Sequence, residues 1–457
     1  MDILTDCYKI NKTMKKNIIE SKSKLTPDDL NILRHLESEQ KVSQRDLSNS
    51  LGISLGKVNF IIRALINKGI IKAKNFKNNK NKRAYAYYLT REGMEEKSRL
   101  TIKFFQRKMS EYDRLKRELK ILEAEIEKNK KVLITGADGF IGSHLVEKLY
   151  HEGCDIRAMI MYNSFNSWGW LDTIDKKILK NIEIYPGDIR DMKSVKNACK
   201  NIDIVFHLAS LIAIPHSYQS PYSYLETNAL GALNLFESSL DSKISKIIHT
   251  STSEVYGEHD IVPISEDNKN IARSPYSATK IAADQLAYSY FSTYDLPITI
   301  IRPFNTYGPR QSNRAIIPTI ITQILNNKIL ELGSLYPTRD FTYIRDTISG
   351  FVSIAENKKS IGQIINIGSG YEISIEDLVE VIQSLMKSNL KIKVSNLRKR
   401  PIKGEVFRLK ANINKANKLL HWKPSFKGKK GLKEGLKETI EWFSRNSNLY
   451  KSSIYNK

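Results

Sequence analysis

The segment KVLITGADGFIGSHL, residues 131–145, constrains the fold of this 457-residue chain more than any other feature. An apolar run that predicts a strand leads directly into Gly136, Gly139 and Gly142, after which a helical pattern begins. Glycines at this spacing let the backbone approach a pyrophosphate at the N-terminus of a helix. Because a strand precedes the glycines and a helix follows them, the segment predicts a dinucleotide-binding site.

Five later apolar segments alternate with helical patterns. They are DIRAMIM, IEIYPGD, IDIVFHLA, KIIHTS and PITIIRP, all of which precede residue 304. Alternation of this kind predicts a doubly wound parallel sheet whose ligand crevice lies at the carboxyl ends of the strands. The predicted fold class is therefore α/β, a Rossmann-like sheet with a small C-terminal substrate lobe over residues 130–445. Residues 446–457 are expected to form a tail.

This crevice supplies the candidate cofactor residues. Besides the three glycines they are Phe140, Ile141, Asn163, Asp188, Ile189, Leu208, Ala209, Tyr276 and Lys280. An NAD-binding site usually offers an Asp or Glu to the ribose at the end of the second strand. Here Met161-Tyr162-Asn163 ends that strand, without a carboxylate and without an arginine that would hold a phosphate. We expect NAD as the cofactor, with NADP left open.

Tyr276 and Lys280 in SPYSATK lie four residues apart, so a helix places them on one face. The lysine ammonium lowers the pKa of the phenol, and the tyrosinate can then take a proton from a substrate hydroxyl. With Thr252 in TSTSEVYG the two residues form the Thr/Tyr/Lys set of short-chain dehydrogenases. Hydride transfer requires only these three groups, so Glu254 in the same segment needs another explanation.

The segments GADGFIGSHL, HLAS, TSTSEVYG, YSATK and RPFNTYGP carry a resemblance that explains the glutamate. From residue 131 to about 445 the chain is similar to extended short-chain dehydrogenases that act on nucleotide sugars. In the 4,6-dehydratases of that family a glutamate follows the catalytic threonine and removes the C5 proton, so that the C6 hydroxyl leaves as water. The resemblance implies a lyase with these catalytic residues: Thr252, Ser253, Glu254, Tyr276 and Lys280.

The substrate stays open within this resemblance. Ser253 stands where dTDP-glucose dehydratases have an aspartate, as it does in GDP-mannose dehydratases, and UDP-glucuronate decarboxylases also carry Thr-Ser-Glu. The segments IMYNSFNSWGWLD, IPHSYQSPYSYLETN and LGSLYPTRDFTYIRD resemble dehydratases of legionaminic-acid pathways, which act on GDP- or UDP-N-acetylglucosamine. The alternatives are a UDP-glucuronate decarboxylase and a nucleotide-sugar 4-epimerase. Candidate substrate residues are Asn305, Arg339, Arg400 and Glu405, with Arg339 expected near the diphosphate and Glu405 near ribose hydroxyls.

A different pattern occupies residues 1–130, which hold 30 Lys/Arg and 17 Asp/Glu. Helices are expected at 27–39 and on both sides of a tight turn at Gly52, and IIKAKNF and AYAYYLT flank the basic loop KNNKNKR as a β-ribbon. The expected packing set is Leu47, Leu51, Ile53, Val58, Ile61 and Leu65. These elements predict a winged helix-turn-helix over residues 25–90, after an N-terminal extension at 1–24.

The basic excess predicts duplex DNA as the partner of this part. Candidate contacts are Ser54, Lys57, Asn59 and Arg63 for the major groove and Lys80, Lys82 and Arg83 for phosphate. The alternatives are a winged helix kept only for protein contacts and a general Lys-rich compositional bias. The segments LGISLGKVN, KNNKNKRAYAYYLT and TREGMEEKSRLT resemble MarR-type regulators associated with exopolysaccharide gene clusters, which implies a dimeric DNA-binding regulator.

Residues 91–129 predict one long helix with a narrow apolar seam. Its members are Ile102, Phe105, Met109, Tyr112, Leu115, Leu119, Leu122 and Ile126. Heptad spacing with one stammer predicts a two-helix contact and hence a dimerisation helix, whereas the alternative is a helix packed on its own domain. By resemblance to extended short-chain dehydrogenases, the segments near 222–240 and 275–294 form a second self-contact. We therefore expect a homo-oligomer, a dimer if both contacts share one two-fold axis and a larger assembly otherwise.

Composition sets the remaining expectations. A hydrophobic fraction of 41% and a charged fraction of 27% are typical of soluble globular proteins. We find neither a secretory signal nor a run that would cross a membrane. The three cysteines form no CxxC pair and the eight histidines show no metal-ligand spacing, so we expect a cytoplasmic protein without a metal. Two functions remain: a dehydratase with a fused DNA-binding domain, and a transcriptional regulator that uses its sugar-nucleotide domain as a sensor.

Overall fold

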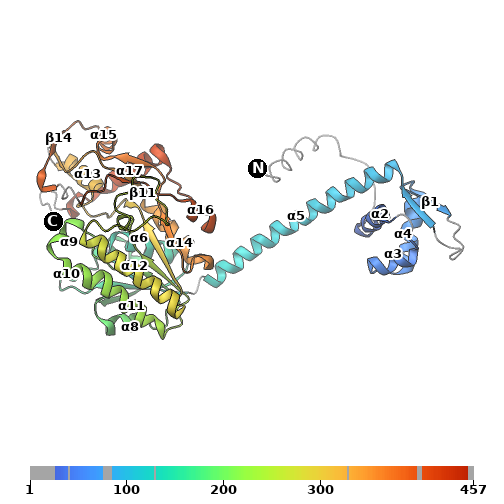
Figure 1. The fold of residues 1–457 in the computed structure, drawn as a ribbon, viewed down its shortest axis with the longest axis horizontal. Coiled ribbons are helices and arrows are strands. Elements are labelled where there is room, and N and C mark those ends of the chain that lie inside the picture. The colour runs from blue at the N-terminus through green and yellow to red at the C-terminus, as the bar shows by residue number, and fades with distance from the viewer. Residues whose placement is uncertain are drawn as a thin grey trace. The chain divides into compact units, whose positions relative to one another are not determined.

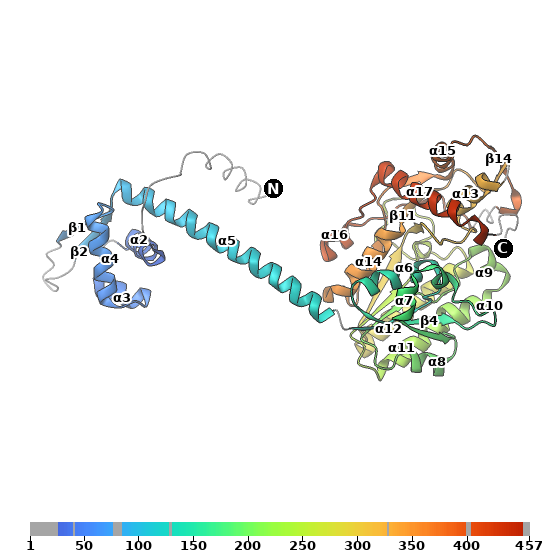
Figure 2. The same ribbon diagram turned by 180° about the vertical axis from the view of Figure 1, so that it is seen from behind.

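The computed structural model of the chain describes residues 26–39, 42–75, 85–127, 130–326, 329–398 and 404–450. The chain divides into two compact units, Met1–Glu123 and Ala124–Lys457 (Figure 1, Figure 2). None of the helices in the described ranges has both the length and the apolar composition that crossing a membrane requires.

The first unit contains three short helices and a two-stranded ribbon. They are α2 (Pro27–Ser38), α3 (Gln44–Leu51), α4 (Leu55–Asn67), β1 (Ile71–Asn75) and β2 (Tyr85–Leu89). Thr26 and Ser43 cap α2 and α3 through capping boxes, in which side chain and backbone satisfy each other's free groups. Gly52 ends α3 with φ at +64°, which glycine adopts without strain, and turns the chain into α4. The predicted winged helix-turn-helix is confirmed.

The core of this unit lies between the helices and the ribbon. Of the predicted packing set, Leu47, Val58, Ile61 and Leu65 are buried, and Leu51 and Ile53 pack against the same cluster. β1 and β2 are antiparallel, with Ile71 opposite Leu89. The basic loop between them, which carries Lys80, Lys82 and Arg83, lies outside the described residues.

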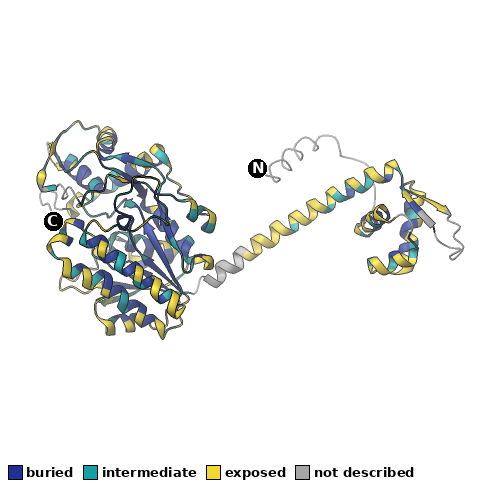
Figure 3. Cartoon of the chain, viewed as in Figure 1, coloured by how far each residue is buried: buried dark blue, intermediate teal, exposed yellow. Residues whose placement is uncertain are grey.

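A single helix, α5 (Arg91–Glu127), follows the ribbon as predicted. Leu100 is buried in the core of the winged helix, and Phe104 contacts the same cluster. Six members of the predicted seam are 41–61% exposed (Figure 3): Ile102, Phe105, Met109, Tyr112, Leu115 and Leu119. The side chains of Leu122 and Ile126 lie outside the described ones. Within the described residues, the first unit therefore covers only the start of α5.

The second unit is built on a seven-stranded parallel sheet. Its strands are β3 (Lys131–Thr135), β4 (Asp155–Met161), β5 (Glu183–Gly187), β6 (Ile204–His207), β7 (Lys246–Thr250), β8 (Ile298–Pro303) and β12 (Ile364–Ile367). The strand order is β12-β8-β7-β6-β3-β4-β5. The order reverses between β3 and β6, the position at which doubly wound sheets bind dinucleotides. All six strands predicted from the sequence are present, and the predicted α/β class is confirmed.

Alternate side chains of the strands enter two cores on opposite faces of the sheet, as the two-residue period of a strand requires. Val132 and Ile134 of β3 face the core under α6 (Phe140–His151) and α14 (Ile344–Glu356), whereas Leu133 faces the other core. The second face is covered by α8 (Met192–Ala198), α11 (Gly231–Leu240) and α12 (Pro275–Tyr294), which lie together in both ribbon views.

The smaller C-terminal lobe is mixed. It contains β9 (Asn305–Tyr307), α13 (Ile316–Asn326), β10 (Ile329–Leu332), β11 (Thr338–Tyr343), β13 (Glu372–Ser374), α15 (Ile375–Met386), β14 (Lys391–Val394), β15 (Arg408–Leu409), α16 (Asn414–Leu420) and α17 (Gly428–Arg445). The ring of Tyr450 packs 4.7 Å from that of Phe443, centroid to centroid. The expected tail therefore begins later than residue 446.

One irregular element was not predicted. Residues 222–240, expected as one helical segment, contain a π-helical turn, η2 (Leu225–Leu230), between α10 (Pro221–Tyr224) and α11. Its buried Asn228 accepts from the Leu211 N–H at 2.8 Å and donates to the Leu211 carbonyl at 3.0 Å and to Thr279 Oγ1 at 3.1 Å. These bonds tie the loop after β6 to α12, so the turn helps to shape one wall of the site.

Candidate functional site

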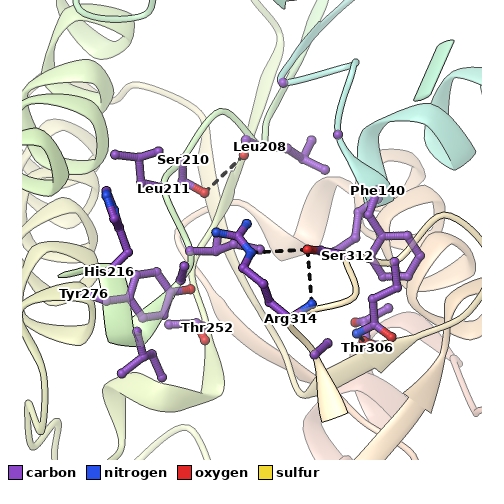
Figure 4. A pocket seen from close by; sticks show the side chains of 18 of the residues that line it. Phe140, Leu208, Ser210, Leu211, His216, Thr252, Tyr276, Thr306, Ser312 and Arg314 are labelled. Carbon is purple, nitrogen blue, oxygen red and sulfur yellow. Dashed lines mark hydrogen bonds between the residues drawn. The ribbon is translucent and has the colours of Figure 1, made fainter. Parts of the chain in front are cut away.

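A cavity of about 1340 Å³ lies at the carboxyl ends of the sheet strands (Figure 4). It brings together residues from both halves of the second unit. The predicted residues that line it are Gly136, Gly139, Phe140, Ile141, Gly142, Asp188, Ile189, Leu208, Ala209, Thr252, Ser253, Glu254, Tyr276, Asn305, Arg339 and Glu405. Cofactor and substrate candidates therefore share one continuous space.

The glycine loop joins β3 to α6 and forms one end of the cavity. A Cβ on Gly136 would stand 2.9 Å from the backbone nitrogen of Ala209, and one on Gly142 would stand 2.2 Å from the Gly136 carbonyl oxygen. Gly139 caps α6 without a side-chain hydrogen bond, which leaves the first backbone N–H groups of the helix for a ligand. A pyrophosphate fits this arrangement of close backbone and helix N-terminus.

Of the two predicted cofactor residues Asp188 and Asn163, Asp188 lines the cavity and Asn163 does not. Asp188 lines the cavity, and its carboxylate binds Arg190, with Nη2 at 2.6 Å and Nε at 3.0 Å, which lowers the pKa of Asp188. Asn163 is not among the residues that line the cavity. Its Nδ2 donates to the Ser167 carbonyl at 2.9 Å and its Oδ1 accepts from the Phe165 N–H at 3.0 Å. Asn163, which was predicted as a cofactor residue, therefore lies outside the cavity lining, and its amide closes a local turn.

The reacting groups meet where β7 and α12 approach each other. Thr252 precedes a short 3-10 turn, η3 (Ser253–Val255), and its hydroxyl accepts from the Glu254 N–H at 3.2 Å. Tyr276 lies in the first turn of α12, which starts at a capping box on Ser274. Burial raises the pKa of Tyr276 and the nearby charge of Glu254 raises it further, whereas a hydrogen bond with Thr252 lowers it. Threonine, glutamate and tyrosine therefore act on one another directly.

Lys280, the third predicted member of the Thr/Tyr/Lys set, does not line the cavity. It is buried on α12 one turn after Tyr276, and its Nζ donates to the Thr250 carbonyl oxygen at 2.5 Å. Burial lowers its pKa to about 8, and the charge of Asp284 opposes that shift. A buried lysine with this pKa is still mostly an ammonium at neutral pH and favours the tyrosinate form of a neighbouring phenol.

Asp284 is a buried residue that the sequence interpretation missed. Its Oδ2 accepts from Ser251 Oγ at 2.8 Å and from Arg302 Nη2 at 2.8 Å. His249 Nε2 lies 3.6 Å from its other oxygen. Tyr276, Lys280 and Asp284 recur every four residues, so their helical spacing was the signal that predicts a shared face.

The substrate end of the cavity contains a buried ion pair. Arg339 Nη2 lies 3.3 Å from Glu405 Oε1, and both side chains are buried. The Oδ1 atom of Asn305 is buried, and no hydrogen-bond partner for it exists among the described residues. Arg400 lies outside the described residues, whereas the nearby Arg398 lines the cavity. These groups suit a ligand that carries both phosphate and hydroxyl groups.

Several further polar residues line the same space without having been predicted, and three of them stand out by their chemistry. They are His216, Gln311 and Arg314. Figure 4 shows Arg314 between Tyr276 and Ser312, with its Nε donating to Ser312 Oγ at 3.2 Å. Burial raises the pKa of Tyr224, whose ring is 6.3 Å from that of Tyr276, and the positive charge of Arg314 opposes that shift. Arg314 therefore places a cation near the reacting end of the cavity.

Comparison with known proteins matches this unit to a single family over most of its length. Residues 133–435 correspond to the protein family described as GDP-mannose 4,6 dehydratase. The chain belongs to this family. Residues 29–72 correspond to a winged helix-turn-helix DNA-binding family, which agrees with the fold of the first unit. The chain is thus a member of a family of nucleotide-sugar dehydratases, epimerases and decarboxylases, and it also carries a winged helix-turn-helix.

Relatives of this GDP-mannose dehydratase family member catalyse different reactions. A UDP-glucuronate 4-epimerase of Thermodesulfobacterium geofontis is 33% identical over 70% of this chain and 98% of its own length. A UDP-N-acetyl-alpha-D-glucosaminuronate decarboxylase of Bacillus cytotoxicus is 33% identical over 69% and 98%. A dTDP-D-glucose 4,6-dehydratase of Homo sapiens is 31% identical over 71% and 92%. Overall identity therefore does not separate the three chemistries.

Two solved structures show what such family members bind. A dTDP-glucose 4,6-dehydratase from Streptomyces venezuelae, solved with NAD, has a TM-score of 0.65 and 25% identity, covering 70% of this chain and 98% of that one. A UDP-glucuronic acid 4-epimerase from Bacillus cereus, solved with UDP-glucuronic acid and NAD, has a TM-score of 0.62 and 31% identity, covering 70% and 100%. Both of these relatives bind NAD in the fold described here.

The candidate DNA contacts of this family member lie on or beside α4. The Ser54 hydroxyl caps α4 by accepting from the Lys57 N–H at 3.3 Å, and Lys57 Nζ pairs with Asp28 at 2.5 Å. Both predicted groups therefore have partners within the unit, whereas Arg63 is exposed and Asn59 is half-buried. Phe60, which was not predicted, is 75% exposed on the same helix. The outer face of α4 thus presents an aromatic ring beside an arginine.

Proposed function

We propose that the second unit is a nucleotide-sugar 4,6-dehydratase that uses NAD. The observation that carries this proposal is the position of Glu254. The residue is only 8% exposed and lines the same cavity as Thr252 and Tyr276, and its charge raises the pKa of the Tyr276 phenol. Simple oxidation and reduction at C4 do not require a carboxylate beside the phenol, whereas elimination across C5 and C6 requires a base.

The chain's own groups divide the reaction between them. Tyr276, as tyrosinate, takes the proton from the C4 hydroxyl, and the Lys280 ammonium stabilises the tyrosinate charge. Thr252 orients the same hydroxyl. Glu254 then removes the C5 proton, which the adjacent C4 ketone acidifies, and the protonated Glu254 gives that proton to the C6 hydroxyl, which departs as water beside Ser253. Bound NAD would supply the hydride acceptor at C4 and the hydride that is returned to C6.

The remaining lining residues divide between cofactor and substrate. Gly136, Gly139 and Gly142 would hold the pyrophosphate, and Asp188 would face the adenine. Phe140, Ile141, Ile189, Leu208 and Ala209 would form the rest of the cofactor wall. Arg339 would bind the substrate diphosphate, and Glu405 would accept hydrogen bonds from the ribose hydroxyls. Asn305 would also bind the substrate. Support comes from their shared cavity and from the buried Asn305 oxygen that has no partner among the described residues.

The test is incubation of the purified chain with GDP- and UDP-N-acetylglucosamine, followed by mass spectrometry. A product that has lost one water is expected from at least one of them. Both substrates are chosen because the loop at 160–172 resembles dehydratases of legionaminic-acid pathways. Unchanged substrate mass with both nucleotides would contradict the proposed substrate class, whereas water loss from GDP-mannose or dTDP-glucose alone would move it to another sugar.

A second candidate is a UDP-glucuronate decarboxylase or 4-epimerase. Arg314 favours it, because a cation close to the reacting end of the cavity suits the carboxylate of a uronic acid. A UDP-glucuronate 4-epimerase and a UDP-N-acetyl-alpha-D-glucosaminuronate decarboxylase are each 33% identical to this chain. Incubation with UDP-glucuronate separates the three reactions if it is followed by NMR: decarboxylation releases carbon dioxide, epimerisation inverts C4 at unchanged mass, and a 4,6-dehydratase leaves the compound unaltered.

For the first unit we propose binding to duplex DNA as a dimer, and hence action in the cytoplasm. The support is the matched winged helix-turn-helix family, the basic excess of residues 1–130, and the exposed Arg63 on α4. A MarR-type regulator of polysaccharide genes stays a prediction from sequence resemblance. If the second unit serves only as a sensor, the purified chain binds a nucleotide sugar without converting it.

We also propose that a second copy of α5 covers the exposed seam. The six seam residues Ile102, Phe105, Met109, Tyr112, Leu115 and Leu119 follow steps of three and four residues, which keep them on one narrow stripe. An apolar stripe of this length is unusual on a surface that stays in water. Whether the second unit adds a second self-contact decides between a dimer and a larger assembly.

A further inference from the structure

Asp138, in the glycine loop, is a carboxylate to which no role has yet been given. It directly precedes Gly139, and its side chain lines the cavity. Its Oδ2 accepts a hydrogen bond from the backbone N–H of Met161 at 3.3 Å. Met161 is the last residue of β4, so the Asp138 carboxylate lies where the second strand of the sheet ends.

The local fold fixes this placement. β3 and β4 are parallel neighbours, with Thr135 opposite Met159, so the loop after β3 and the end of β4 meet at one edge. The Asp138 carbonyl accepts from the Trp170 N–H at 3.0 Å, and a Cβ on Gly169 would stand 3.0 Å from the Asp138 Cβ. The segment after β4 therefore packs onto Asp138 and holds it at the cavity wall. Burial raises the pKa of its carboxyl group.

Dinucleotide-binding sheets usually place an acidic residue at the end of the second strand, where it binds the ribose hydroxyls and disfavours a 2′-phosphate. In this chain β4 ends without one, and Asn163 is occupied by its own turn. A carboxylate nevertheless occupies that place, supplied from the preceding loop. One oxygen holds the Met161 N–H, and a carboxylate has further lone pairs with which to accept from a ribose hydroxyl.

We propose that Asp138 binds the adenosine ribose of the cofactor and is the residue that selects NAD over NADP. This inference rests on the proposed function only in that it requires a bound dinucleotide; it is independent of which sugar reaction follows. A 2′-phosphate at this position would face the Asp138 carboxylate at close range, which is unfavourable for two like charges. A ribose hydroxyl instead donates a charged hydrogen bond to it.

Two other carboxylates line the same part of the cavity and are committed elsewhere. Asp172 Oδ2 accepts from Ser167 Oγ at 2.8 Å and from the Trp168 N–H at 3.1 Å, so it shapes the segment after β4. Asp188 is bound to Arg190. Arg190 is the cation that would have to hold a 2′-phosphate, and its guanidinium is bound to Asp188 through two nitrogens.

The test compares Asp138→Asn with Asp172→Asn and the unsubstituted chain. Each full-length protein, freed of bound dinucleotide, is titrated with NAD+ and with NADP+ by calorimetry. Asparagine keeps an oxygen that accepts from the Met161 N–H, so the loop retains its hydrogen bond while the charge is lost. We expect the ratio of the NADP+ to the NAD+ dissociation constant to fall about 100-fold, since about 10-fold reflects the lost charged hydrogen bond and about 10-fold the lost repulsion. Asp172→Asn keeps an oxygen that accepts from Ser167 Oγ and the Trp168 N–H, so the segment that holds Asp138 should keep its shape, and the ratio should stay within about 2-fold of that of the unsubstituted chain.

The outcomes separate the two proposals. An unsubstituted chain that binds neither dinucleotide contradicts the proposed function as well as the role of Asp138. If that chain prefers NAD+ and Asp138→Asn keeps the same preference, the role of Asp138 is wrong while the proposed function stands. Equal weakening of both dinucleotides would also contradict the selective role, because it would show that Asp138 only shapes the loop.

Discussion

Lys280 and Asp284 stand one helical turn apart on the buried face of α12, and the aspartate charge holds up the pKa of the lysine. Without that charge, burial would lower the pKa of Lys280 further below its value of about 8. Asp284 is itself fixed by Ser251 and Arg302. The carboxylate does not line the cavity, so it acts on the reaction through Lys280.

Asp284→Asn should therefore move the alkaline limit of activity to lower pH. Removing the negative charge lowers the pKa of Lys280, so the ammonium that stabilises the tyrosinate is lost earlier as pH rises. The unfolding free energy should also fall by about 3 kcal/mol, because Arg302 loses its buried counter-charge. A pH profile of kcat/KM and a urea titration measure the two effects. Glu147→Gln, which removes the partner of Arg310 at 2.6 Å, is the control that should lower stability without moving the pH limit.

Lys280→Met should stabilise the second unit at neutral pH while abolishing activity. The pKa of Lys280 falls from 10.5 to about 8 on folding, so below pH 8 the folded state carries the cost of a buried charge. That cost is about 3 kcal/mol, and Lys280→Met removes it. The variant also loses the hydrogen bond to Thr250, which reduces its gain in stability by about 1 kcal/mol. The advantage of the variant should shrink as pH rises from about 8 towards 10.5, where the folded lysine is neutral.

All four tryptophans, Trp168, Trp170, Trp422 and Trp442, lie in the second unit, so their fluorescence follows its unfolding alone. Unfolding by urea at several pH values provides the measurement. A variant that is less stable than the unsubstituted chain at pH 7, or a difference that grows above pH 8, would refute this account of the lysine.

Arg63→Ala should weaken DNA binding more than Lys57→Ala. Arg63 is exposed on α4, whereas the Lys57 ammonium is paired with Asp28. Fluorescence anisotropy with labelled duplex DNA at rising salt should show a steep salt dependence, which Arg63→Ala reduces by about one unit of slope in log K against log salt. An affinity that does not change with salt, or a larger loss from Lys57→Ala, would contradict the assigned surface.

Leu115→Glu should prevent self-association of the fragment 1–130. The side chain is 53% exposed in the middle of the seam, and a charge there would be buried by a second α5. Light scattering should report a dimer for the unsubstituted fragment and a monomer for the variant. Lys108→Glu, whose side chain lies outside the seam and pairs with Glu111, is the control and should remain dimeric. A monomeric unsubstituted fragment would remove the proposed contact.

Features with a local or periodic cause were predictable from the sequence. Six of the seven strands of the parallel sheet, the capped helices around Gly52 and the glycine loop each follow from short-range patterns and are present in the structure, whereas β12 was not predicted. The grouping of Thr252, Tyr276 and Lys280 was predictable for two reasons. Four-residue spacing places Tyr276 and Lys280 on one face of α12, and Thr252 follows the carboxyl end of a strand, where the ligand crevice lies.

What was missed depends on contacts between distant segments. The bond between Asp138 and the end of β4 spans 23 residues, and the one between Asp284 and Ser251 spans 33. Asn163 was assigned to the ribose because its position at a strand end is visible in the sequence, whereas the turn that occupies its amide is not. The π-helical turn around Asn228 likewise arises from bonds to Leu211 and Thr279.

In the proposed function, Glu254 is the residue that makes this chain a dehydratase. The most direct test supplies the nucleotide sugar with deuterium at C4 and follows the label by NMR and mass spectrometry. We predict a 4-keto-6-deoxy product that has lost water and carries the deuterium at C6, and no dehydration by Glu254→Gln, which should still bind NAD. Deuterium that stays at C4 or appears in free reduced cofactor, or water loss at an undiminished rate in Glu254→Gln, would contradict the claim.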